Sequence, residues 1–171
     1  MTNLIFLLVL LFLFSVQTTF LGVFSIFGIT PDLILIVAVY SGIHSKKESG
    51  VWLAVLLGFV QDCLSGGLLG VNSLSKGLAG LFFCALKDKI FVEGPIPISF
   101  FIFFTSLVDG LIYLLAMTSI LGGQAKGGFF FSSVILFGIY NAVVAPFLFY
   151  MFDKGRKWIN LRLSSQAFDT I

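Results

Sequence analysis

The sequence predicts an all-α fold, a polytopic membrane bundle of about six transmembrane helices. Of its 171 residues, 58% are hydrophobic and only 11% are charged, whereas a soluble domain carries about twice that charged fraction. A span of the ~30 Å hydrocarbon core takes about 20 apolar residues, so the chain holds about six spans and no separate aqueous domain. This composition excludes a soluble enzyme or nucleic-acid-binding domain, and nucleic acid is not an expected partner.

The first apolar run covers residues 4–24. No lysine or arginine precedes Lys46 and no alanine precedes Ala38, so the run lacks the marks of a cleavable secretory signal and is predicted to be a permanent span. Its second half turns polar, which suggests that one face meets protein. Pro31 and Asp32 then begin the second run, residues 33–43, because proline and an acid both suit the first turn of a helix.

The second and third runs are short for complete crossings. The third run covers residues 51–60, and with flanking residues each run has about 14 residues, or ~21 Å of helix. Residues 31–62 therefore form either two short spans or a re-entrant pair. Short spans are favoured, because a re-entrant turn would leave Lys46 and Lys47 inside the membrane.

Three longer runs follow. The fourth covers residues 68–86, and paired prolines at residues 93–97 predict a rigid loop that resists helix. The fifth covers residues 98–120, and after a glycine-rich loop the sixth covers residues 129–152. Residues 1–152 are thus expected to form one transmembrane domain, with residues 153–171 as a basic cytoplasmic tail.

Lysine and arginine placement predicts the orientation. With six crossings and a cytoplasmic N-terminus, eight of the ten basic residues fall in the cytoplasm, as the positive-inside rule favours. Both termini are then cytoplasmic, in a bacterial cytoplasmic (inner) membrane that supplies surrounding lipid. The eight residues are Lys46, Lys47, Lys87, Lys89, Lys154, Arg156, Lys157 and Arg162.

Small residues step by four, three, four and three through the segment joining the third and fourth runs. On a helix this spacing gives one small-residue face that lets another backbone approach closely. The face serves either the protein's own packing, which is favoured, or a partner, which otherwise docks along the fifth and sixth spans. Its members are Gly66, Gly70, Ser73, Gly77 and Gly80.

Asp62 and Lys76 are charged residues within this apolar region. An ammonium inside the bilayer needs a partner or access to the interface, so the sequence predicts an ion pair between them. The pair is either a structural bridge between the third and fourth spans or part of a proton or ion relay. The bridge is favoured, because a relay needs a chain of titratable groups.

Asp109 lies at the centre of the fifth run and is predicted to face the bundle, because Ser106 shares its helical face. It is either protonated, paired with Lys76, or hydrogen-bonded to Asn141 or Tyr140. A buried, satisfied carboxyl is favoured over a ligand site.

The sixth run carries Asn141 on a face of small and polar residues. Pro146 should kink this helix and free the carbonyl of Ala142, which a neighbouring helix must then satisfy.

Cofactors and metals are not expected. Cys63 and Cys84 lie far apart in sequence, and His44 is the only histidine. No usual ligand set for zinc, iron–sulfur or haem can be assembled from these residues. The intramembrane charges have no nucleophile or metal to serve, so an enzyme is the least favoured class.

Several short motifs follow one another in an order and spacing that resemble the bacterial rod shape-determining protein MreD family. The length, span number and basic tail also match, so the resemblance covers nearly the whole chain. The motifs are residues 31–35 (PDLIL), 58–59 before Asp62, 65–67, 69–70, 140–142 and Pro146.

The resemblance implies a non-enzymatic membrane subunit of the cell-elongation machinery that binds MreC. Together the two would link cytoplasmic MreB filaments, indirectly, to the peptidoglycan synthases RodA and a class B penicillin-binding protein. It also implies a fold like the substrate-binding subunits of energy-coupling-factor transporters. The alternative function is therefore a vitamin-type uptake subunit, although the first span lacks the alanines with which such subunits dock their coupling module.

Overall fold

The structure, a computed structural model, describes residues 11–20, 22, 25–45, 47–66, 68–89, 94–121 and 127–168. Within these ranges the fold is all-helical, as predicted, with no strand and one isolated bridge between Ile26 and Ile29. Outside the described part lie residues 4–10, 21, 23 and 24 of the predicted first span, Lys46, residues 122–126 of the glycine-rich loop predicted at 121–128, and residues 169–171. The elements are a π-helical turn η1 (Val16–Phe20), α2 (Leu33–His44), α3 (Lys47–Ser65), α4 (Val71–Leu86), α5 (Pro95–Leu121) and α6 (Gly127–Phe168).

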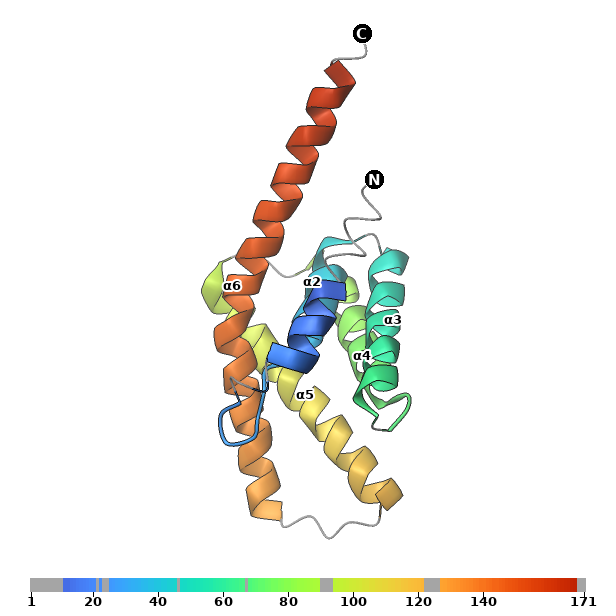
Figure 1. Cartoon of the computed structure of the whole chain (residues 1–171), viewed down its shortest axis with the longest axis vertical. Coiled ribbons are helices and arrows are strands. Elements are labelled where there is room, and N and C mark those ends of the chain that lie inside the picture. Colours follow the sequence, from blue (N-terminus) through green and yellow to red (C-terminus); the bar gives the residue numbers. More distant parts are fainter. Residues whose placement is uncertain are drawn as a thin grey trace.

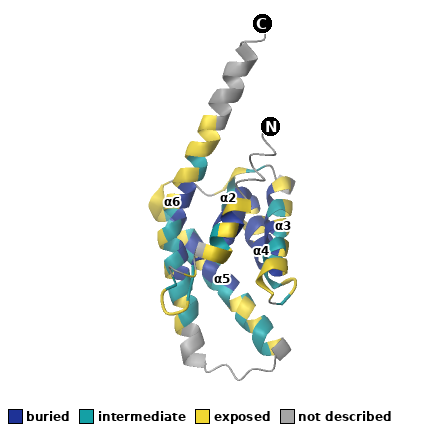
Figure 2. Ribbon diagram, in the orientation of Figure 1, coloured by how far each residue is buried: buried dark blue, intermediate teal, exposed yellow. Residues whose placement is uncertain are grey.

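Helix α2 forms the centre of the bundle (Figure 1), where it contacts α3, α4, α5 and α6. Nine of its twelve residues are buried, including Ile34, Leu35 and Ile36. A helix that is apolar on every side is stable only when surrounded, either by lipid or by other helices. Here the other helices surround it, and Figure 2 shows the buried residues gathered around α2 and the helices beside it.

Helices α3 and α4 form an antiparallel hairpin beside α2 (Figure 1). The third run was predicted over residues 51–60, but α3 has 19 residues and is ~28 Å long. The difference arises because the prediction counted apolar residues, whereas backbone hydrogen bonding continues through the polar residues at both ends of the run.

Helices α5 and α6 form a second, longer hairpin. Both are long and apolar enough to cross a membrane, over Pro95–Ser119 and Ser132–Trp158, by length and composition. Helices α2, α3 and α4 are shorter apolar helices, so six complete spans remain a prediction.

The expected rigid loop at residues 93–97 is wrong in part, because Pro95 and Pro97 lie in the first turn of α5. Prolines are tolerated there, since the first backbone N–H groups of a helix have no intrahelical acceptor.

Helix α6 continues through Pro146 and runs on to Phe168 as one element of 42 residues. Proline cannot donate to the carbonyl one turn earlier, which belongs to Ala142. The Ser99 hydroxyl of α5 donates to this carbonyl over 2.8 Å. A neighbouring helix thus supplies the missing donor and ties the two helices of the hairpin together. The described backbone of the predicted tail, residues 153–168, continues this helix.

Candidate functional site

A cluster of buried charged and polar side chains lies in the interior, with Lys76 of α4 at its centre. The Lys76 side chain is 0% exposed. Its ammonium lies 2.8 Å from Asp32 Oδ2 and 3.1 Å from Asp109 Oδ1, and it donates to Asn72 Oδ1 over 2.7 Å. Three acceptors therefore take up the three protons of the ammonium.

Asp32 enters the cluster from the N-terminus of α2. As the N-cap, it accepts the backbone N–H groups of Ile34 and Leu35 at 3.0 and 3.1 Å through Oδ1. Its second oxygen, Oδ2, accepts from Gln61 of α3 at 3.1 Å and from Lys76. The carboxylate is thus held by a helix N-terminus, which favours negative charge, and by an ammonium.

Asp109 enters from the middle of α5 and is buried, facing the bundle as its helical pattern predicted. Of the partners considered from the sequence, the structure selects Lys76. The Ser75 hydroxyl, beside Lys76 on α4, also donates to Asp109 Oδ1. These contacts connect the α5–α6 hairpin to α4.

Asn141 makes the corresponding connection from α6. Its Oδ1 accepts the backbone N–H of Asp32 over 2.7 Å, and its Nδ2 donates to the Ser106 hydroxyl over 2.9 Å. Asn141 and Ser106 have no exposed surface. Asn141 therefore orients the start of α2 rather than bonding to Asp109, which was one of the arrangements considered above.

The predicted ion pair between Asp62 and Lys76 is wrong. Both Asp62 oxygens accept backbone N–H groups at the start of α4, from Gly70, Asn72 and Ser73 at 2.9 to 3.0 Å. The Asn72 side chain lies between the two charges, donating to Asp62 and accepting from Lys76. The carboxylate caps α4 because the short connection from α3 places it beside unpaired helix N–H donors.

The predicted helical face of small residues is correct only in its second half. Gly66 and Gly70 lie in the turn before α4 with φ of +62° and +95°, a conformation that glycine adopts without strain. Gly77 and Gly80 lie on α4 and face α3 closely. A Cβ at Gly80 would come within 2.6 Å of Ala54 Cβ, so this part of the face packs inside the protein.

Ser73, the remaining member of that face, also turns towards α3. Its hydroxyl donates to the Val55 carbonyl over 3.2 Å, and a Cβ on Gly77 would meet the Val55 side chain at 2.8 Å. Close approach and a hydrogen bond thus operate together between α3 and α4.

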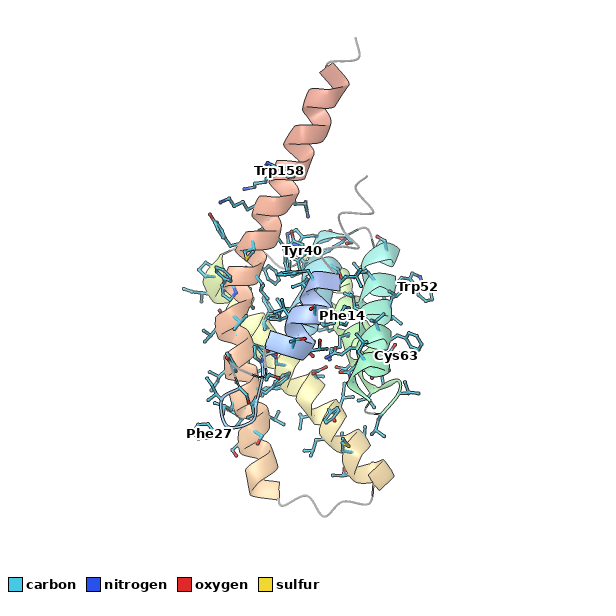
Figure 3. All side chains as sticks on the ribbon, viewed as in Figure 1. Phe14, Phe27, Tyr40, Trp52, Cys63 and Trp158 are labelled. Carbon is cyan, nitrogen blue, oxygen red and sulfur yellow. The ribbon has the colours of Figure 1, made fainter. Side chains whose placement is uncertain are left out.

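A second polar contact joins α2 to α6 at the other end of α2. The Tyr40 hydroxyl donates to Asp153 over 2.8 Å, and His44 Nδ1 donates to the Tyr40 carbonyl over 3.1 Å. Partial burial is the main cause that lowers the pKa of His44, at the polar end of α2, below its ordinary 6.5. Figure 3 shows Tyr40 at this end of α2.

The buried cluster holds the helices together. Five helices contribute charged or polar groups that bond to one another, so most donors and acceptors are used internally. Within the described ranges, no group of three or more His, Cys, Asp or Glu side chains is placed to hold a metal ion. One buried acceptor, Gln61 Oε1, has no partner among the described atoms.

The comparison with known proteins decides the family. The family whose sequence model matches is described as rod shape-determining protein MreD, and the match covers residues 1–155. The chain belongs to the MreD family. Neither the curated proteins nor the solved structures give a match. As an MreD-family protein it is a membrane protein that determines rod shape, and the family is not known as an enzyme.

Sequence reasoning identified Lys76, Asp109 and Asn141 but missed Asp32 as the main partner of the lysine. Asp32 was assigned only to the start of α2. The signal was available, because an acid in an otherwise apolar stretch needs a counter-charge as much as an ammonium does. Gln61 and Ser75 were missed as well, since uncharged polar residues give no comparable signal.

Proposed function

We propose that this MreD-family protein is a non-enzymatic scaffold subunit of the cell-elongation machinery that binds MreC within the membrane. Through MreC it helps to direct peptidoglycan synthesis by RodA and a class B penicillin-binding protein, and it reaches MreB filaments indirectly. The family match over residues 1–155 carries this proposal.

The interior supports a scaffold role. The charged groups of the cluster are buried and bond mainly to each other, so they stabilise one arrangement of helices. Binding must therefore use the outer surface, which is largely apolar. In a membrane, such a surface contacts either lipid or the helices of other membrane proteins.

We place the MreC contact on the outward faces of α5 and α6. Exposed apolar residues recur at four-residue spacing along α6, at Ile139, Val143 and Phe147, and along α5, at Phe104 and Val108. Residues four apart lie on one helical face, so each row offers a continuous surface to a partner helix. The small-residue face of α4 is unsuited to this role, because Gly77 and Gly80 already contact α3.

The test compares bulky substitutions on two sides of the molecule. We expect Val143→Trp and Val108→Trp to abolish co-purification with MreC and convert rods to spheres at normal membrane abundance. The matched controls are Leu78→Trp on α4 and Leu56→Trp on α3, two exposed leucines that should leave both readouts unchanged. Loss of binding in the controls but not in the α5 and α6 variants would move the contact to α3–α4.

Depletion of the protein tests the function itself. We expect depleted rod-shaped cells to become spherical. Unchanged rod growth after complete depletion, together with impaired uptake of a vitamin, would favour the transport function instead.

A further inference from the structure

The helices fall into two length classes that end at different levels. Helices α2, α3 and α4 have 12, 19 and 16 residues, whereas α5 has 27, or ~18, ~28, ~24 and ~40 Å. Figure 1 shows the end of α3, the start of α4 and residues 25–31 before α2 stopping well short of the end of α5 and the start of α6. Beside an α5 that crosses the ~30 Å hydrocarbon core, these two ends therefore lie at a shallower level than the end of α5.

The two short ends carry no charged side chain and expose large apolar ones. No Asp, Glu, Lys, Arg or His occurs in residues 16–31 or 63–75, whereas the α5–α6 connection carries Lys126. Phe27 is 88% exposed and Leu69 is 74% exposed, and Figure 3 shows Phe27 pointing away from the bundle. Large apolar side chains at the tips of turns are unfavourable in water and favourable in acyl chains.

The backbone N–H groups at the start of α4 are paired within the protein. Asp62 accepts the N–H groups of Gly70, Asn72 and Ser73, and the Val71 N–H donates to the Leu68 carbonyl over 3.4 Å. The N–H groups at the start of a helix are otherwise left to solvent. In hydrocarbon no water is available, so internal partners of this kind are required.

The tip before α2 follows the same pattern. Two N–H groups at the start of α2 are donated to side chains of the protein: Asp32 donates to the buried Asn141, and Leu33 donates to Oε1 of the half-buried Gln17 over 2.9 Å. Ile26 and Ile29 exchange two backbone hydrogen bonds of 3.0 Å. Two separate tips therefore combine exposed apolar side chains with internally paired backbone donors.

We infer that both tips end inside the outer half of the bilayer and bind outer-leaflet acyl chains, so that only the α5–α6 hairpin reaches the outer aqueous phase. The ligand class is the lipid hydrocarbon chain. The short helices would then thin the outer leaflet over α2–α4, since a bilayer thins locally around a short hydrophobic segment. The depth of the two tips in the membrane does not depend on MreC binding.

The first test is cysteine accessibility in intact cells. In a Cys63→Ser, Cys84→Ser background, single cysteines replace Phe27, Leu69 or Gln124, and an impermeant maleimide is applied from outside. We expect full labelling at position 124 and none at 27 or 69, although both become labelled in denaturing detergent. Labelling of position 27 or 69 as complete as that of position 124 overturns the inference for that tip.

A second measurement covers the case in which a cysteine variant does not accumulate. Leu69→Trp, in a Trp52→Phe, Trp158→Phe background, is reconstituted in vesicles of phosphatidylglycerol and phosphatidylethanolamine. We expect lipids brominated on the acyl chain to quench its fluorescence and aqueous acrylamide to have little effect. Stronger quenching by acrylamide than by brominated lipid overturns the inference.

Discussion

Replacing Lys76 by methionine removes the ammonium and leaves two buried carboxylates without a counter-charge. Its contacts to Asp32 and Asp109, at 2.8 and 3.1 Å, each correspond to about 5 to 6 kcal/mol of attraction at an effective dielectric constant of about 20. Burying the ammonium opposes most of this sum. Removing one partner of a buried ion pair lowers the free energy of unfolding by ~3–5 kcal/mol, because the remaining charge is uncompensated. We expect Lys76→Met to lower it by a similar amount.

The assay is equilibrium unfolding in mild-detergent micelles titrated with dodecyl sulfate and followed by circular dichroism. A double-mutant cycle separates the two candidate partners of Lys76. We expect Lys76→Met and Asp109→Asn to be coupled by at least ~1 kcal/mol, since the second change removes one stranded charge. The matched cycle with Asp62→Asn should show weaker coupling than the cycle with Asp109→Asn, because Asp62 is connected to Lys76 only through the shared Asn72 side chain.

Two results would refute this reasoning. If Lys76→Met lowers the free energy of unfolding by less than about 1 kcal/mol, the buried ion pair is dispensable for stability. Coupling of Lys76 to Asp62 as strong as its coupling to Asp109 would restore the pairing predicted from the sequence.

Two further predictions concern the helix contacts. Ser99→Ala should lower the free energy of unfolding by ~1 kcal/mol, because it leaves the Ala142 carbonyl unpaired. In a Pro146→Ala background the same change should be nearly neutral, because the helix regains its own N–H donor. An equal loss of stability in both backgrounds would contradict this account. Gly80→Ala should destabilise by ~1–3 kcal/mol through its clash with Ala54, and Ala54→Gly should recover part of that loss in thermal unfolding; no recovery would place the strain elsewhere.

Composition and periodicity alone determined the all-helical class, the membrane setting and the order of the helices. These properties depend on how many apolar residues occur in succession, which a sequence states directly. The motif order also indicated the MreD family, which the match over residues 1–155 shows. The requirement for a donor to the Ala142 carbonyl followed from Pro146 in the same local way.

Only the tertiary structure decided which charges pair. Asp62 and Lys76 lie closer in sequence than Asp32 and Lys76, yet Asp62 is engaged by the N–H groups of α4, while the start of α2 brings Asp32 to the lysine. Gly66 and Gly70 were predicted on a helical face but lie in the turn before α4. A spacing of four and three residues does not by itself show where the helix begins. Which charges pair depends on which helix ends lie close together in the folded protein, and a linear sequence pattern does not show this.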